Sequence, residues 1–283
     1  MINALTIDIE DYWSIFSRDW LHIEIEPTDA VVINTEWFLK KLEQYNTKAT
    51  FFVLDGVAKK FPGLIKKIAQ AGHEIASHGM GHIQIFKLEQ EQFRKDIAES
   101  KKHIEDIISS PIFGYRAPAF SITPKTQWAL DILAQENFKY DSSVFPISGK
   151  RYGWPGFSKG ICKIALPSGR NIIEVPLSTT TIWGKTLPAA GGGYIRHFNY
   201  AITRWAIKRI EKTRPAIVYM HPYEIDTKER TLKFEHLSYK ERFKAIKFHK
   251  MQKRNRNTMP QKINKLLSEF KFVPVRDLIK NIE

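Results

Sequence analysis

The sequence predicts an α/β fold built on a largely parallel sheet or barrel. Short apolar runs of strand length alternate with amphipathic stretches of helix length, and this alternation is typical of parallel strands joined by helices. Clusters of acidic, basic and histidine side chains directly follow several of the apolar runs. Parallel α/β folds place ligands at the carboxyl ends of their strands, so the same pattern predicts a functional site.

The first half of the chain begins with a strand, and a helix follows in which Asn34 or Thr35 serves as the cap. Gly72 is a good terminator for the second helix. In order, the predicted elements are a strand at Ile2 to Ile7, a helix at Asn34 to Tyr45, a strand at Ala49 to Leu54, a helix at Pro62 to Ala71 and a strand at His73 to Ala76.

The alternation continues with a long polar helix that carries one apolar stripe. The next helix has Pro124 in its first turn, where proline is favoured. The predicted elements here are a helix at Glu89 to Ile108, a strand at Ile112 to Tyr115, a helix at Thr123 to Gln135 and a strand that starts at Phe138.

Residues 145–193 are rich in Gly, Pro and Ser, with β-like pieces at Lys163 to Leu166 and Asn171 to Val175, and we interpret the segment as a loop-rich insertion near the mouth of the site. A helix at His197 to Lys212 and a strand at Ala216 to Met220 then resume the pattern. We therefore predict one catalytic domain over 1–226 and a basic, mostly helical C-terminal extension over 227–283 that packs on the same domain.

Composition limits the class of protein. The apolar fraction of 43% supports a sizeable core, and the single cysteine, Cys162, fits a reducing compartment. The N-terminus lacks the basic start and apolar stretch of a signal peptide, and the apolar runs are too short to span a bilayer. These features lead us to expect a cytoplasmic protein.

The formal net charge is +14, and eight of the Lys and Arg residues lie between Tyr239 and Arg256 with one acid, Glu241. The simplest interpretation is a solvated helix face. The functional one is peripheral contact with an anionic membrane, at the inner face for a cytoplasmic protein, or with a sugar-phosphate lipid. We predict no nucleic-acid partner because no recognised reader motif is present. The oligomeric state is left open.

Two of the polar clusters indicate a metal site. Asp8, Glu10 and Asp11 follow the first strand, and close carboxylates repel unless a cation or proton relieves them. His78 and His82 flank a Gly-rich turn, and imidazoles with one carboxylate suit Zn²⁺, with Co²⁺ or Ni²⁺ as alternatives. Taken singly, the acids also fit a polar turn with helix caps, and the histidines also fit a surface loop.

Two further clusters each contain one candidate residue. Arg116 follows a strand and precedes Ala117-Pro118, where a guanidinium can hold a carboxylate ionised or simply form an ordinary salt bridge. His221 follows the apolar run that ends at Met220. A single histidine is more often structural, but this position favours a general acid.

Together the four clusters resemble the polysaccharide deacetylase family, the NodB-homology domain of carbohydrate esterase family 4. The matching motifs are Asp8 in the acidic motif, His78 to His82, Arg116-Ala117-Pro118 and Met220-His221-Pro222. The first motif (Asp8 to Tyr12), Tyr140 to Ser143, Gly191 to Tyr194 and His221 to Glu224 resemble the branch found with exopolysaccharide and exosortase loci. The resemblance implies a distorted (β/α)7-type barrel.

The resemblance also implies a metal-dependent deacetylase that releases acetate from an N-acetylated amino sugar, in a polysaccharide or a lipid-linked glycan precursor. The resemblance then makes Asp8 the general base, Arg116 the residue that positions Asp8, and His221 the general acid. The metal ligands are His78, His82 and Glu10, with Asp11 as the alternative because the usual adjacent aspartates are spaced differently here.

Other roles implied by the family are less direct. The residue that orients His221 is Asp141, with Glu174 as the alternative, and the substrate-binding residues are Tyr12, Ala119 and Tyr194. Two alternatives stay open at this point: hydrolysis of another non-peptide amide on the same fold, and a catalytically silent glycan-binding protein.

Overall fold

The structure is a computed structural model that describes residues 1–149, 152–228, 230–232, 234–280 and 282. Its main sheet has nine strands in the order β10-β1-β2-β3-β4-β5-β7-β6, and β11 pairs with β1 beside this path. From β10 to β7 every neighbouring pair is parallel, and only β6 runs antiparallel at the edge. The fold is therefore the α/β distorted barrel that the sequence predicts.

The strands are short, as is usual for a parallel sheet that is covered on both faces. Their bounds are β1 Ile2–Ile9, β2 Thr50–Val53, β3 Glu74–Ser77, β4 Gly114–Tyr115, β5 Tyr140–Asp141, β6 Cys162–Ala165, β7 Asn171–Glu174, β10 Ile217–Met220 and β11 Lys271–Val273. A separate hairpin consists of β8 Thr179–Ile182 and β9 Lys185–Pro188.

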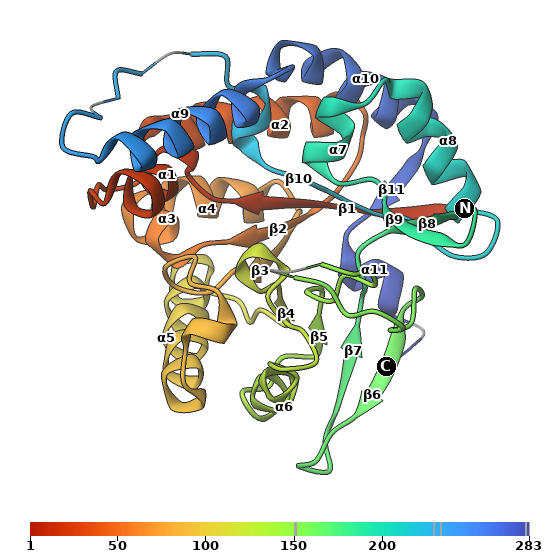
Figure 1. Ribbon diagram of the computed structural model, residues 1–283. Helices are drawn as coiled ribbons and strands as arrows, with labels where there is room; N and C mark the ends of the chain where they lie inside the picture. Colours follow the sequence, from red (N-terminus) through yellow and green to blue (C-terminus); the bar gives the residue numbers. More distant parts are fainter. Residues whose placement is uncertain (150–151, 229, 233, 281, 283) are drawn as a thin grey trace.

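Helices surround the sheet, with α2, α8, α9 and α10 above β1 in Figure 1 and α5 and α6 below it. The larger helices are α1 Tyr12–Leu21, α2 Asp29–Gln44, α4 Pro62–Gln70, α5 Gln90–Ile108, α6 Trp128–Gln135, α8 Tyr200–Ile210, α9 Tyr239–Lys253 and α10 Met259–Glu269. The shorter ones are α3 Asp55–Lys60, α7 Gly192–His197, α11 Val275–Ile279 and four 3-10 turns, at Ile85–Lys87, Pro118–Phe120, Pro222–Ile225 and Arg256–Thr258.

Strand β1 is the centre of the core. All of its residues after Ile2 are buried, because β2 and β10 flank it and helices cover both faces. The largest apolar cluster joins Leu5 and Ile7 of β1 to Ile263 and Leu266 of α10. The C-terminal extension therefore shares the main core.

None of the helices among the described residues has the length and apolarity needed to cross a bilayer.

Two predicted helix starts and the predicted loop region need correction. Helix α2 begins at Asp29 with Thr28 at its N-cap, so Asn34 and Thr35 are buried inside the helix. Helix α6 begins at Trp128. Within residues 145–193, the two predicted β-like pieces are confirmed as β6 and β7, but both belong to the main sheet, where β7 is a parallel neighbour of β5, and not to a separate loop.

Candidate active site

Five of the predicted site residues come together at the carboxyl ends of four parallel strands. Asp8 lies near the end of β1 and Glu10 follows it, while His78, Arg116 and His221 are the first residues after β3, β4 and β10. Because these strands are parallel and only β2 separates β1 from β3, their carboxyl ends meet at one edge of the barrel. Residues more than 200 positions apart in the sequence can therefore share one cavity.

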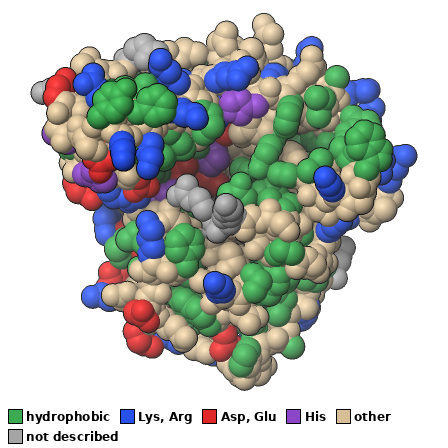
Figure 2. Space-filling view, in the orientation of Figure 1, with side chains coloured by type: hydrophobic (Ala, Val, Ile, Leu, Met, Phe, Trp, Pro, Cys, Tyr) green, Lys and Arg blue, Asp and Glu red, His purple; other side chains and the backbone are tan. Residues whose placement is uncertain are grey.

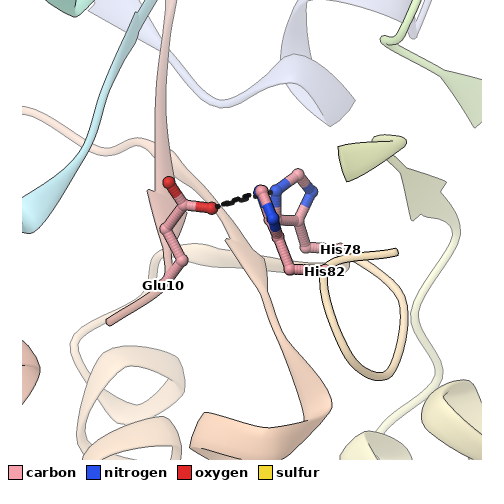
Figure 3. A group of neighbouring side chains, drawn as sticks. All are labelled: Glu10, His78 and His82. Atoms are coloured by element: carbon pink, nitrogen blue, oxygen red, sulfur yellow. Dashed lines mark ion pairs between the residues drawn. The ribbon is translucent and has the colours of Figure 1, made fainter. Parts of the chain in front are cut away.

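Glu10, His78 and His82 form a compact group of metal-ligand type. Their ligand atoms all lie within 4.8 Å of one another. Glu10 Oε2 is 2.8 Å from His82 Nε2 and 3.7 Å from His78 Nε2, and Figure 3 shows the carboxylate facing both imidazoles. The two histidines of the Gly-rich turn therefore point at Glu10, one of the three acids in the first motif.

Local backbone geometry aims the two imidazoles. His78 Nδ1 lies 2.7 Å from the carbonyl oxygen of Arg116, so Nδ1 carries the proton and Nε2 is left as the ligand atom. Gly79 has φ +78° and would bring a Cβ to 3.2 Å from an Asp96 oxygen. The Met80 amide donates to Asp96 Oδ1 at 3.1 Å, so Asp96 of α5 holds the turn.

Arg116 holds Asp8 on the opposite side of the group. Its Nη1 donates to Asp8 Oδ1 at 2.7 Å and to Thr6 Oγ1 at 2.8 Å, while Nε and Nη2 donate to the carbonyl and hydroxyl oxygens of Ser142. The guanidinium also lies 4.0 Å from the centre of the Phe52 ring. Both charged side chains are buried, and they form a charge-assisted hydrogen bond.

His221 stands across from the two histidines. Its Nε2 is 3.5 Å from Glu10 Oε1 and 3.8 Å from Asp8 Oδ2, and its Nδ1 is 2.8 Å from Glu224 Oε1. Burial lowers the pKa of His221, but Glu10, Glu224 and Asp8 outweigh it and raise that pKa to about 9. The neighbouring carboxylates thus favour the protonated imidazole, the form that a proton donor needs.

The carboxyl groups of Glu10 and Asp11 have different partners and therefore different roles. Burial raises the pKa of Glu10, but His82 and His221 outweigh it and hold that pKa well below its usual range. Asp11 instead caps α1 through Ser14 N at 2.9 Å and accepts from the amide and hydroxyl of Thr28. Asp11 is a helix cap and lies outside the ligand group, so the alternative that placed it on a metal is wrong.

The predicted contact of Asp141 or Glu174 with His221 is also absent. Asp141 accepts from the Ser143 hydroxyl at 2.6 Å and from its amide at 3.0 Å. Glu174 accepts from the Val144 amide at 3.0 Å. The orienting carboxylate is Glu224, the last residue of the motif His221 to Glu224, to which the sequence analysis assigned no role in orienting His221.

A cavity of about 250 Å³ surrounds the group, and Figure 2 shows histidine and acidic side chains at the bottom of a hollow. Tyr12 and Ala119 line it, as predicted, and Ala119 has φ +53°. Tyr194 lies farther out, in a second pocket that shares Tyr152 with the first. The other lining residues include Trp20, Phe120, Tyr152, Tyr223, Phe248 and Gln252, and of these six only Tyr223, in the motif His221 to Glu224, belongs to a motif that resembles the exopolysaccharide branch.

The fold and the site together define a deacetylase-type α/β barrel. A crystal structure from Mycobacterium smegmatis, of a protein classed with the polysaccharide deacetylases, superposes with a TM-score of 0.65 at 18% identity, over 99% of this chain and 89% of that one. Residues 28–139 match the family model "Polysaccharide deacetylase", and residues 142–280 match a "Domain of unknown function (DUF3473)". Residues 28–139 thus carry a polysaccharide deacetylase domain.

Curated relatives are similar over a shorter segment. A peptidoglycan-N-acetylglucosamine deacetylase of Bacillus cereus is 38% identical over 90 residues, which are 32% of this chain and 30% of the relative. A chitooligosaccharide deacetylase of Rhizobium leguminosarum bv. trifolii is 34% identical over 70 residues, 25% of this chain and 33% of the relative. The chain thus spans about a third of the length of these relatives.

Proposed function

We propose that this protein hydrolyses the N-acetyl group of an amino sugar within a glycan and releases acetate. The observation that carries the proposal is the arrangement around Glu10: two imidazoles on one side, and His221 on the other at 3.5 Å, with Asp8 beside it. Amide hydrolysis needs an activated water, a base and an acid. The group Glu10, His78 and His82 suits a metal ion that activates water, Asp8 suits the base, and His221 suits the acid.

The ligand group fits a divalent metal, and zinc is the ion we propose. Glu10 Oε2 is buried and no described residue gives it a hydrogen bond of good geometry, although His82 Nε2 is 2.8 Å away. Close contact without a hydrogen bond is expected when two ligands face one shared ion. Two imidazoles and one carboxylate form an open three-ligand set of the catalytic zinc type, and Co²⁺ or Ni²⁺ would fit the same donors.

When bound, such an ion polarises the amide carbonyl and makes water more acidic. Asp8 then accepts the proton of the attacking water, since Arg116 occupies its Oδ1 and leaves Oδ2 toward the cavity. His221 donates a proton to the leaving nitrogen through Nε2, while Glu224 holds Nδ1. The backbone N–H at Ala119 is the proposed donor to the developing oxyanion, and Tyr12 contacts the sugar.

We also propose that the glycan is polymeric or lipid-linked and that α9 meets an anionic membrane surface. Tyr239 and Phe243 of α9 are exposed among the basic residues of 239–256, and aromatic and basic side chains together favour anionic lipid headgroups. Cosedimentation with phosphatidylserine vesicles tests this contact: a Phe243→Ala, Lys247→Ala variant that sediments like the wild type counts against it. The cytoplasmic compartment remains a prediction.

Metal analysis combined with an acetate-release assay on N-acetylated oligosaccharides tests the enzymatic proposal. We expect about one zinc ion per chain in the wild type, little in His78→Ala, and full metal content but at least a hundredfold lower kcat in Asp8→Asn. Loss of metal and loss of activity are thus measured separately. A metal-loaded wild type that releases another acid, or none, from every glycan in the panel would refute N-deacetylation.

A further inference from the structure

We infer that the C-terminal extension recognises the substrate, with the Gln252 side-chain amide donating a hydrogen bond to a glycan oxygen outside the scissile amide. This inference rests on the proposed function and specifies how that site selects its substrate. Gln252 and Phe248 lie on α9, within the 142–280 segment matched by the domain of unknown function. Both line the catalytic cavity together with Asp8, Glu10 and His221.

Helix α9 lies next to α1 in Figure 1, and aromatic stacking fixes the two helices together. The Phe248 ring lies 4.4 Å from the Trp20 ring, centre to centre, at an angle of 16°, and 6.2 Å from the Phe16 ring at 2°. All three rings line the cavity. Through Phe248 the extension therefore forms part of the cavity wall. Gln252 follows Phe248 by one turn of the same helix.

Two arginines fix Gln252. Arg196 Nη2 donates to Gln252 Oε1 at 3.1 Å, and the Gln252 carbonyl accepts from Arg256 Nε at 2.8 Å and from Arg196 Nη1. A guanidinium can only donate, so the atom bound to Arg196 must be the amide oxygen. The NH₂ group is then the free part of the side chain, and no described residue provides an acceptor for it.

The two arginines that fix Gln252 are buried at a cost in free energy, and this cost argues that they serve substrate binding. Arg196 and Arg256 are 3% and 1% exposed, and among the described residues neither has a carboxylate within ion-pair distance. Burying a guanidinium without an anionic partner is unfavourable. Arg256 instead lies 4.6 Å from the centre of the Tyr12 ring and 5.2 Å from that of Tyr223, both of which line the cavity.

An amide NH₂ fixed in this way recognises a hydrogen-bond acceptor, such as a sugar hydroxyl or the carbonyl of an acetyl group on a neighbouring unit. Aromatic rings beside it suit the apolar face of a sugar. The substrate class that fits is an N-acetylated oligosaccharide that contacts α9 as well as the catalytic group, and the extension then selects among such glycans.

The test compares Gln252→Ala and Gln252→Glu with Met251→Ala, an exposed neighbour on the same helix that does not line the cavity. The probe is the N-acetylglucosamine tetramer, titrated calorimetrically against zinc-loaded protein and assayed for acetate release. We expect Gln252→Ala to raise Kd and KM about tenfold with kcat changed less than twofold. Gln252→Glu should weaken binding at least as much, because it replaces the donor with an acceptor.

The outcomes separate this inference from the proposed function. If the wild type binds the tetramer without releasing acetate, deacetylation fails, while the Kd values still test Gln252. If Gln252→Ala binds and turns over like Met251→Ala, the role of Gln252 is refuted. Failure of the wild type to bind the tetramer at all counts against both proposals.

A double-mutant cycle tests whether Arg196 acts as a positioning residue through Gln252. Arg196→Met should raise Kd severalfold in the wild type, yet change it less than twofold in the Gln252→Ala background, since coupled residues are not additive. Thermal unfolding of each variant monitors folding. If Arg196→Met changed Kd equally in both backgrounds, Arg196 would act independently of Gln252 and would not be its positioning residue.

Discussion

At the scale of single residues, the site depends on which carboxylate holds which partner. Glu224 holds His221 Nδ1 at 2.8 Å and is buried. Gly192 makes room for it, because a Cβ there would lie 2.0 Å from Glu224 Oε1. Glycine at 192 is thus required by the carboxylate that orients the imidazole, and this explains part of the Gly-Gly-Gly-Tyr motif at Gly191 to Tyr194.

Glu224→Gln should therefore impair catalysis while leaving glycan binding largely intact. The amide keeps the size of the side chain but loses the charge that favours protonated His221, so we expect kcat to fall at least tenfold and KM to change less than threefold. Acetate release measures both constants. Glu235→Gln, on an exposed side chain, is the control, and equal kcat values in the two variants would contradict the assignment.

At the scale of elements, the sequence predicted most of the sheet because apolar strand runs in a parallel barrel are nearly continuous. The strand ends also located Asp8, His78, Arg116 and His221 correctly. Helix α6 was placed too early because Thr123-Pro124 resembles a helix start. In the structure the Thr126 hydroxyl accepts from the Thr123 amide and donates to the Ser121 carbonyl, which is a local turn that competes with helix.

The sequence alone could not predict the roles of residues that depend on tertiary contacts. Asp11 and Glu10 are adjacent and chemically alike, and only the contacts of Asp11 with the Ser14 amide and with Thr28 show that it is a cap. Gln252 and Phe248 reach the cavity because the extension folds back over α1. No local pattern in 239–256 distinguishes that arrangement from a solvated helix.

The junction of β2 and β3 carries a pH-dependent contact. The Ala49 amide donates to His73 Nδ1 at 3.2 Å, which requires a neutral imidazole. Burial, with Lys48 and Arg276, lowers the pKa of His73 to about 4. Between that pH and the unfolded value near 6.5, the unfolded chain binds more protons than the folded one. His73 therefore contributes stability above about pH 6.5 that is lost as pH falls toward 4.

Replacement of His73 by Gln should flatten this part of the stability curve. Urea unfolding at pH 7 and at pH 4.5 gives the free energy of unfolding for both proteins, and we expect the decrease on acidification to be smaller in His73→Gln by about 1 to 2 kcal/mol. His22→Gln, on an exposed side chain, is the control. The same decrease in the wild type and in His73→Gln would show that His73 is not the group responsible.

At the scale of the whole molecule, β1 and the extension share one sheet and one core. Strand β11 pairs with the start of β1, Asn3 opposite Phe272, while the end of β1 carries Asp8. Phe270 and Phe272 join the main core cluster, and the Val275 amide donates to Thr50 Oγ1 of β2 at 2.7 Å. The segment that walls the substrate cavity is thus anchored in the sheet that supports the catalytic group.

Phe272→Ala should consequently destabilise the entire protein and not just its last residues. Removing a buried aromatic ring leaves a cavity and costs about 3 to 4 kcal/mol, and cooperative unfolding should lower the melting transition seen by far-UV circular dichroism and by loss of zinc to the same extent. Phe243→Ala removes the same ring from an exposed position on α9 and should change the free energy of unfolding by less than about 0.5 kcal/mol. If Phe272→Ala released the extension to proteolysis while zinc binding and the main transition stayed at their wild-type values, the extension would be a separate unit, and its part in the substrate cavity would have to be transient.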